Sequence, residues 1–238
     1  NLIGCEPDEK VSAFIGVKEF NDDHYVVMAT EKGMVKKTKL SAYSNPRKKG
    51  IYAVEIRDGD KLIEARVSTG DNDILLGTRN GKSIRFSEEQ IRASGRKTMG
   101  VKGITLSSED DRLVGMLLIK REGTVLVATE KGFGKRTEIS QYRAQKRGGK
   151  GVLTMKTTDK VGKMVTIKEV VDKDDLMIIT NQGVLIRLPV AQIRSIGRAT
   201  QGVKLIKLGE GTLVSSITRI MSEEEDENNN TESTGPKE

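Results

Sequence analysis

Four segments of this sequence share one pattern, and this repetition restricts the fold more than any other feature. Each segment has an apolar run of β-forming residues, a short polar turn that ends in glycine, and a second run of β-formers that ends in cations, which is typical of a β-hairpin. The segments are HYVVMATEKGMVKKTKL from His24, DILLGTRNGKSIRF from Asp73, TVLVATEKGFGKRTEI from Thr124 and DLMIITNQGVLIRL from Asp175. The sequence therefore predicts four copies of one small β unit.

The glycines of this pattern recur at a nearly constant spacing. The turn glycines, separated by 48, 51 and 51 residues, are Gly33, Gly81, Gly132 and Gly183. A second glycine follows each of them, at Gly50, Gly100, Gly151 and Gly202. Two more strand-like runs complete each unit, for example VKGITL and RLVGMLLI in the second one. Four strands in about 50 residues, arranged radially, predict an all-β, propeller-like fold with four-stranded blades.

The repeats also predict the domain organisation. We expect one domain over 1–221, made of a partial blade at 1–19 and four complete repeats at 20–70, 71–121, 122–172 and 173–221. The partial blade is predicted because DEKVSAFIGV matches DDRLVGMLLI, so the chain is either a fragment of a longer protein or supplies a leading strand that completes the last blade. Beyond Met221 the apolar pattern stops, and the composition of 222–238 predicts a disordered acidic tail.

The charge distribution points to a polyanionic partner. The formal net charge is +7, but segment 222–238 carries seven acidic residues and one lysine, so residues 1–221 carry +13. Much of this charge lies in a basic loop before the second glycine of each repeat, at 45–50, 95–100, 146–151 and 197–202. Cations at one position of a radial array lie along one side of it, which predicts a basic track.

The composition of the loops indicates which polyanion they bind. They contain no aromatic residue on which single-stranded bases could stack, and no amphipathic recognition helix is visible. The remaining mode of binding is contact with the backbone of duplex DNA, which gives strong salt dependence and little sequence specificity. Outside the densest loop, the predicted DNA-binding cations are Arg47, Lys48, Lys49, Arg96, Lys97 and Arg198.

The densest loop has the sequence QKRGGKG. Three cations and three glycines in seven residues let a backbone approach an anion while the charges bind it. We therefore predict DNA contacts from Gln145, Lys146, Arg147, Gly148, Gly149, Lys150 and Gly151. The cations would pair with phosphates, the first two glycines would allow close approach, and the glutamine would bind a phosphate or hold the loop.

This heptad matches all seven positions of the motif called the gyrase A box. The surrounding repeats resemble the C-terminal domain of the DNA gyrase A subunit over residues 1–221, including GFGKRT and GRATQGVKLI. The resemblance implies a β-pinwheel, in which neighbouring blades exchange strands, and right-handed wrapping of duplex DNA that enables negative supercoiling by the ATP-driven type IIA topoisomerase. In the family the box normally lies in the first blade, whereas here it lies in the third complete repeat, so we infer that earlier blades lie outside this chain.

The same resemblance implies partners and a location. It implies duplex DNA, the gyrase B subunit and the rest of the gyrase A subunit in an A2B2 assembly, in the bacterial cytoplasm at the nucleoid, with ATP and magnesium acting elsewhere in the parent enzyme. The chain itself has one cysteine, one histidine and no recognisable acid–base or nucleophile set, so we expect no catalytic residue, metal ligand, cofactor or small-molecule substrate. No apolar run approaches the roughly 20 residues that cross a bilayer, so we expect no membrane contact.

Two other functions remain open at this point. The corresponding domain in the A subunit of topoisomerase IV shares the repeats but generally lacks an intact box. A propeller that serves as a protein-interaction scaffold would bind an acidic protein instead of DNA, and the salt dependence of binding would distinguish it.

Overall fold

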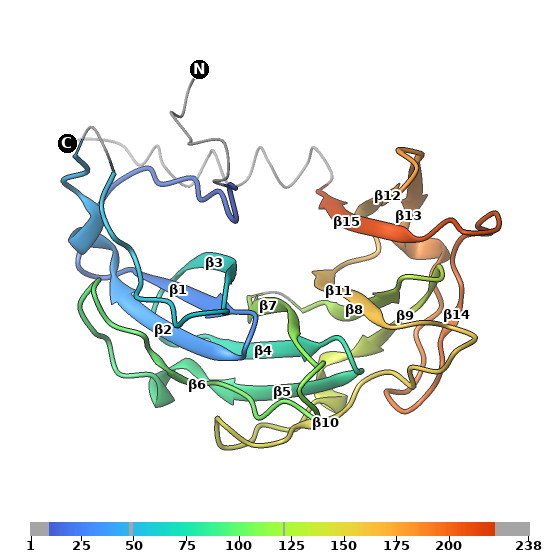
Figure 1. Cartoon of the computed structure of the whole chain (residues 1–238), viewed down its shortest axis with the longest axis horizontal. Helices are drawn as coiled ribbons and strands as arrows, with labels where there is room; N and C mark the ends of the chain where they lie inside the picture. Colours follow the sequence, from blue (N-terminus) through green and yellow to red (C-terminus); the bar gives the residue numbers. More distant parts are fainter. Residues whose placement is uncertain (1–9, 48–49, 121, 222–238) are drawn as a thin grey trace, which may run out of the picture. The chain divides into compact units, whose positions relative to one another are not determined.

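The structure is a computed structural model, which describes residues 10–47, 50–120 and 122–221 (Figure 1). Two predicted DNA-binding residues, Lys48 and Lys49, and the acidic segment 222–238 lie outside these ranges. The described residues form β-strands and short 3-10 helices. Among them, no helix is long and apolar enough to span a membrane.

The strands of the first two repeats are β1 (Tyr25–Thr30), β2 (Met34–Lys39), β3 (Leu62–Ser68), β4 (Asp73–Thr78), β5 (Lys82–Ser87), β6 (Val101–Lys102) and β7 (Leu113–Ile119). Those of the last two are β8 (Thr124–Thr129), β9 (Phe133–Glu138), β10 (Val152–Leu153), β11 (Met164–Val170), β12 (Asp175–Thr180), β13 (Leu185–Pro189), β14 (Val203–Lys204) and β15 (Val214–Ile220). A 3-10 helix follows the second strand of each hairpin: η1 (Leu40–Tyr43), η2 (Glu88–Gln90), η3 (Ile139–Gln141) and η4 (Val190–Gln192).

The chain divides into two compact units. The first contains residues 1–78, 83–120 and 144–151, and the second contains 79–82, 121–143 and 152–238. The QKRGGKG loop therefore belongs to the first unit, although it follows the hairpin of the third repeat in the sequence.

The sheets of the first unit are built around two predicted hairpins. One sheet has the order β3-β1-β2-β6, and the other contains β5-β4-β7. Strands β1 and β2 pair antiparallel from Tyr25↔Lys39 to Ala29↔Val35, and the turn between them ends at Gly33, whose φ is +82°. A left-handed φ is readily adopted only by glycine, which explains why the turn glycine recurs in each repeat.

The sheets of the second unit repeat this arrangement. One has the order β11-β8-β9-β14 and the other β13-β12-β15. The turn glycines, Gly132 and Gly183, have φ values of +78° and +77°. The predicted all-β fold of hairpin repeats of about 50 residues is therefore confirmed.

Strand exchange links consecutive repeats, as the pinwheel expectation requires. Strand β6 of the second repeat pairs with β2 of the first through Val101↔Val35, and β14 of the fourth pairs with β9 of the third through Val203↔Gly134. The exchanged strands are only two residues long, shorter than the strand-like runs in the sequence.

The exchanged strands are short because the chain turns towards the preceding hairpin. Next to β6, the N–H groups of Gly103 and Ile104 donate to the carbonyl of Gly33 at 2.9 and 3.3 Å. Next to β14, Leu205 and Ile206 donate to the carbonyl of Gly132 at the same two distances. These N–H groups cannot continue a strand ladder.

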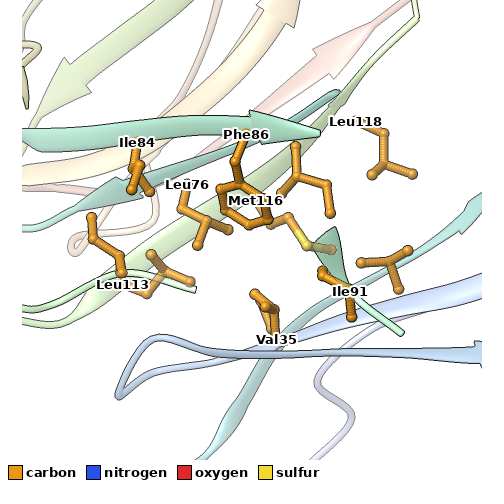
Figure 2. Packing of buried hydrophobic residues seen from close by; sticks show 12 residues of the cluster. Val35, Leu76, Ile84, Phe86, Ile91, Leu113, Met116 and Leu118 are labelled. Carbon is orange, nitrogen blue, oxygen red and sulfur yellow. The ribbon is translucent and has the colours of Figure 1, made fainter. Parts of the chain in front are cut away.

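The core of the first unit lies between its two sheets (Figure 2). Figure 2 shows Phe86 and Met116 at its centre, with Val35 of the neighbouring hairpin and Ile91 approaching them. Phe86 and Met116 are fully buried, and branched aliphatic side chains fill the space around them. A corresponding cluster in the second unit contains Leu126, Leu176, Ile206 and Ile217.

The segment before β1 covers the other face of the first sheet. Ala13, Ile15 and Val17 pack against Val26 and Met28, although residues 10–23 form no strand. Because both faces of this sheet are covered, β1 is a continuous apolar run with no alternation of polar residues.

Candidate nucleic-acid interface

The basic loops of the second, third and fourth repeats lie directly against the backbone of the preceding hairpin, which explains the second glycine in these repeats. A Cβ atom on Gly151 would lie 2.2 Å from the carbonyl oxygen of Ser83. A Cβ on Gly100 would lie 2.4 Å from the oxygen of Val35, and one on Gly202 would lie 2.6 Å from that of Gly134. No side chain fits at these distances, so the loop can reach this position only with glycine.

A backbone hydrogen bond fixes the other end of these three loops, at the residue six positions before the second glycine. Gln145 donates its N–H to the carbonyl of Arg85 at 2.8 Å. Ser94 donates to Lys37 and Ile196 to Arg136, both at 2.9 Å. Three loops are therefore held at both ends by the same pair of backbone contacts.

Within the QKRGGKG loop, the glycine carbonyls point into the protein. The Oγ1 of Thr105 donates to the carbonyl of Gly148 at 2.7 Å, and its N–H donates to that of Gly149 at 2.9 Å. Gly148 has a φ of +80° and donates its own N–H to Gly103 at 2.7 Å. These contacts fix the backbone of the loop before any ligand arrives.

The arginine of this loop is held by backbone carbonyls of the preceding repeat. Arg147 donates from Nε to the carbonyl of Gln90 at 2.9 Å and from a terminal nitrogen to that of Lys102 at 3.1 Å. Its N–H donates to the side-chain Oε1 of Gln90 at 2.9 Å. The Arg147 side chain lies partly buried at the base of the loop.

The same arginine contact recurs in two other repeats. Arg96 donates to the carbonyl of Tyr52 at 3.1 Å, and Arg198 donates to that of Leu153 at 2.8 Å. Each acceptor lies two residues after the second glycine of the preceding repeat, as Lys102 does for Arg147. In the first repeat, Pro46 occupies this position and Arg47 follows it, exposed.

The other predicted site residues fall into two groups. Lys97, Lys146 and Lys150 are exposed, so their ammonium groups can meet an incoming phosphate. Gln145 is half-buried, and its Nε2 is enclosed with no hydrogen-bond partner among the described residues. This amide lies on the protein side of the loop.

Sequence reasoning missed a set of cations that recurs beside the loops. The residue eleven positions after the turn glycine is an exposed arginine in three repeats: Arg92, Arg143 and Arg194. The exchanged strands add two exposed lysines, Lys102 and Lys204. The signal was in the sequence, because these residues stand in register across the repeats, but they lie just outside the glycine-rich segments.

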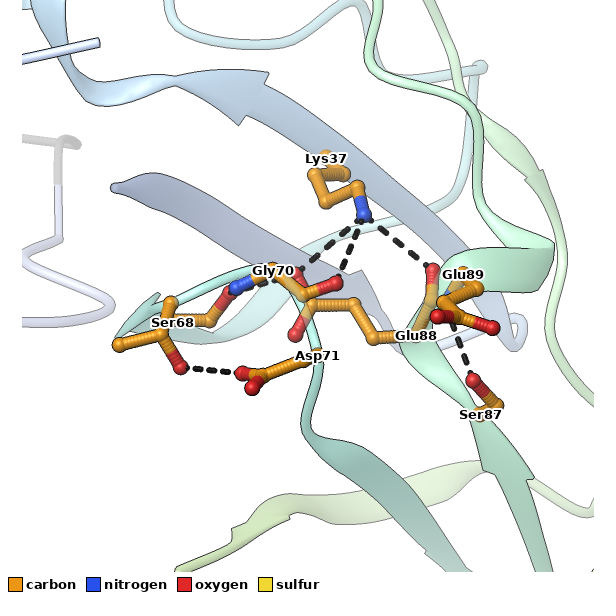
Figure 3. Close-up of polar contacts among 8 residues, drawn as sticks. Lys37, Ser68, Gly70, Asp71, Ser87, Glu88 and Glu89 are labelled. Atoms are coloured by element: carbon orange, nitrogen blue, oxygen red, sulfur yellow. Dashed lines mark hydrogen bonds and ion pairs between the residues drawn. The ribbon is translucent and has the colours of Figure 1, made fainter. Parts of the chain in front are cut away.

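A buried polar network supports the helix that holds Arg147 (Figure 3). The Nζ of Lys37 lies 3.5 Å from Oε1 of Glu88 and donates to the Glu88 carbonyl at 3.3 Å. Ser68 donates its hydroxyl to the same carboxylate, which is fully buried. Glu88 begins η2, which ends at Gln90, so the ion pair fixes the residue that binds Arg147.

Two further lysines lie beneath the basic loops. Lys36 and Lys135 are 2% and 0% exposed, and each donates to carbonyl groups of the loop above it. Burial lowers the pKa of each lysine to about 8, and the nearby charges of Arg96 and Arg198 are the second cause.

The family model described as "DNA gyrase C-terminal domain, beta-propeller" matches the chain four times, over residues 24–69, 72–120, 123–170 and 174–220. The chain belongs to this family. The DNA gyrase A subunit of Staphylococcus epidermidis (strain ATCC 12228 / FDA PCI 1200) is 46% identical over 231 residues, which cover 96% of this chain and 26% of that protein. The DNA gyrase A subunit of Staphylococcus aureus (strain NCTC 8325 / PS 47) is 44% identical over 235 residues, with coverages of 98% and 26%.

Solved structures with the same fold belong to two kinds of topoisomerase. The C-terminal domain of DNA topoisomerase IV matches with a TM-score of 0.87 at 23% identity, covering 97% of this chain and 73% of that one. The DNA gyrase A C-terminal domain matches with a TM-score of 0.83 at 23% identity, covering 92% and 73%. This gyrase C-terminal domain chain spans about a quarter of the length of its curated relatives.

Proposed function

We propose that this chain binds and wraps duplex DNA, largely without sequence specificity, as part of the A protein of a gyrase. The observation that carries this proposal is the QKRGGKG loop, whose backbone is fixed and whose Lys146 and Lys150 are exposed. A fixed loop with outward ammonium groups loses little conformational entropy when it binds a phosphate. Family membership supports the same function.

The proposal assigns different roles to the predicted residues. Lys146, Lys150 and Lys97 contact phosphates, and the exposed arginines 92, 143 and 194 extend the contact surface. Arg96, Arg147 and Arg198 hold the loops and add positive potential from below. We infer that the parent protein works with the B protein of gyrase in an A2B2 enzyme of the bacterial cytoplasm, and that ATP and magnesium act elsewhere in it.

The first test is the salt dependence of duplex DNA binding. For a contact with phosphates, log Kobs falls linearly with log salt, with a slope of about −0.9 for each phosphate neutralised. The paired substitutions Lys146→Ala and Lys150→Ala should make the slope shallower by about 1.8. The control pair Lys61→Ala and Lys160→Ala removes the same charge from exposed lysines outside the basic loops, and it should leave the slope nearly unchanged.

The second test measures wrapping. Relaxed circular DNA is incubated with the chain, a nicking–closing topoisomerase relaxes the unconstrained turns, and the linking number is read. We expect a change for the native chain that the paired lysine substitutions abolish and the control pair preserves. Equal slopes and equal linking numbers for both pairs would contradict a role for this loop, and weak binding that is insensitive to salt would favour the protein-interaction alternative.

A further inference from the structure

Two positions of each repeat alternate along the chain between two kinds of residue. They are the third and tenth residues after the turn glycine. In the first and third repeats they hold lysine and tyrosine, whereas in the second and fourth both hold isoleucine. The pairs are Lys36 with Tyr43, Ile84 with Ile91, Lys135 with Tyr142, and Ile186 with Ile193. We call each pair a seat, because in the first three repeats the basic loop of the next repeat lies on it.

The lysine seat of the first repeat binds the loop above it through oxygen atoms. The Nζ of Lys36 donates to the carbonyl of Arg96 at 2.5 Å and to that of Ala53 at 2.8 Å. The hydroxyl of Tyr43 donates to the same Ala53 carbonyl at 3.1 Å. The ammonium group thus joins the next repeat's loop to the strand-like run of its own repeat.

The lysine seat of the third repeat makes the same kind of contact. The Nζ of Lys135 donates to the carbonyls of Gly197, at 2.7 Å, and Arg198, and to the hydroxyl of Thr200 at 3.1 Å. The hydroxyl of Tyr142 is hydrogen-bonded to that of Thr154 at 2.7 Å, and the guanidinium of Arg198 lies over the Tyr142 ring.

The loops on the two lysine seats have a shared sequence that the QKRGGKG loop lacks. Both read Gly-Arg-x-Thr-x-Gly, at 95–100 and 197–202. In each, the threonine hydroxyl donates to the carbonyl of the first glycine, from Thr98 at 3.0 Å and from Thr200 at 3.1 Å. This internal bond folds the loop so that its carbonyls face the buried ammonium.

The isoleucine seat of the second repeat holds the QKRGGKG loop by apolar contact. Ile84 and Ile91 are 0% and 2% exposed. A Cβ on Gly149 would lie 3.5 Å from Cδ1 of Ile84, so the loop backbone rests directly on this side chain. The carbonyls of Gly148 and Gly149 are bound by Thr105 instead of a lysine.

We propose that Lys36 and Lys135 are positioning residues that select the Gly-Arg-x-Thr-x-Gly loops, whereas the isoleucine seat selects the QKRGGKG loop. This pairing of seat and loop follows from hydrogen bonding. A buried ammonium group needs carbonyl acceptors that point into the protein, and an isoleucine cannot donate a hydrogen bond to such carbonyls. A second part of the inference rests on the proposed function: the lysine seats also determine how these two loops contact DNA. The alternation of seats is then an alternation of two DNA-contacting loops.

A cycle of variants in the second unit tests the match independently of DNA. The seat variant is Lys135→Ile with Tyr142→Ile. The loop variant converts 196–202 to the QKRGGKG sequence, which has the same length, through Ile196→Gln, Gly197→Lys, Ala199→Gly, Thr200→Gly and Gln201→Lys. Each variant alone should lower Tm by about 5 °C or more, and the combination should recover at least half of the summed loss.

Additivity of the two losses would overturn the proposed match, as would a combined variant that fails to fold when both parents fold. The reciprocal change in the first unit, Ile84→Lys with Ile91→Tyr, provides a second test of the pairing. It should destabilise the chain with its native QKRGGKG loop and be rescued by a Gly-Arg-x-Thr-x-Gly loop at 146–151. A lack of rescue there would also overturn the proposal.

Duplex DNA binding tests the functional part. Lys135→Met keeps the length of the side chain but removes the ammonium, and we expect a roughly three- to tenfold loss of affinity, at a temperature well below the Tm of the variant. Lys135→Arg, which keeps the donors, should recover part of the loss. If the native chain binds DNA and the Lys135→Met chain binds it with the same affinity, the positioning role of Lys135 would be overturned but the proposed function would not. If the native chain failed to bind DNA, the proposed function would be refuted. The pairing of seats and loops would then be tested by the Tm values of the variants alone.

Discussion

At the residue scale, the cations of the basic loops divide by what their side chains contact. Arg96, Arg147 and Arg198 each bind a backbone carbonyl of the preceding repeat, whereas Lys146 and Lys150 are exposed. The planar guanidinium suits fixed carbonyl acceptors, and a flexible exposed ammonium can follow a phosphate backbone. Position in the loop therefore separates anchoring cations from exposed ones.

The second glycines should be intolerant of alanine wherever a preceding hairpin lies beneath them. Gly151→Ala forces a Cβ to within 2.2 Å of a carbonyl oxygen, and we expect a loss of about 3 kcal/mol or more in the free energy of unfolding. Gly50 has a similar φ of +78°, but no atom of the described residues lies within 4 Å of its Cβ position. Gly50→Ala should therefore cost only the conformational strain, about 1 kcal/mol. Denaturant unfolding measures both, and equal losses would contradict the close approach.

The two buried lysines should make stability depend on pH in the alkaline range. The pKa of Lys36 and of Lys135 is lowered from 10.5 to about 8, chiefly by burial. Between these values the unfolded chain still binds protons that the folded chain has released, so stability should rise with pH from about 8 to about 10.5.

The comparison that isolates this effect uses Lys36→Met with Lys135→Met. Denaturant midpoints of the native and doubly substituted chains are measured at about pH 8 and about pH 10, within the window set by the lowered pKa values. The rise with pH should be smaller in the substituted chain. An identical rise in both chains would contradict the assignment to these lysines.

At the element scale, each of the first three hairpins supports a loop that comes about 60 residues later. The turn-glycine carbonyl binds two N–H groups of the following repeat, and the second hairpin strand binds the start of the loop. The 3-10 helix after the hairpin adds a third contact in the second repeat, where Gln90 of η2 binds Arg147. Contacts with the preceding repeat thus fix the position of these three loops, in addition to any hydrogen bonds within the loops.

The buried ion pair of Lys37 with Glu88 should tolerate apolar substitution only when both residues are changed. Glu88 occupies a position that is Leu40, Ile139 or Val190 in the other repeats. Glu88→Ile alone leaves Lys37 buried without its carboxylate and should cost about 3 kcal/mol. Adding Lys37→Met should recover most of that loss, because apolar packing often replaces a buried ion pair without a penalty. Chemical unfolding of the single and double variants decides this, and a double variant no better than Glu88→Ile would contradict it.

At the scale of the whole molecule, the described contacts join each repeat to its neighbours in sequence. The same backbone bonds, the same second glycine and the same arginine recur within the two units. Stability of such an array is approximately a sum of repeat terms and nearest-neighbour interface terms. The fourth repeat differs, because β13 is an edge strand of its sheet and Val184 and Leu185 are 50% and 54% exposed.

Hydrogen exchange should reveal this difference within the second unit. Strand β9 is paired on both sides, by β8 and β14, whereas β13 pairs only with β12 among the described residues. We expect the amides of β13 to exchange at least tenfold faster than those of β9, because an edge strand opens without breaking a second ladder. Comparable protection of the two strands would mean that another segment covers the β13 edge.

The sequence alone determined the hairpins, the repeat length, the turn glycines and the basic loops, because these depend on local rules of β propensity, turn conformation and charge. The recurrence of Gly100, Gly151 and Gly202 was also visible in the sequence, but the structural reason for it was not. Only the tertiary structure decided that these glycines rest on a carbonyl of the previous hairpin, that the loop arginines are anchors, and that Lys36 and Lys135 lie beneath loops. Each of these contacts joins residues about 40 to 70 positions apart, and a cation that binds a distant carbonyl looks the same in the sequence as one that faces solvent.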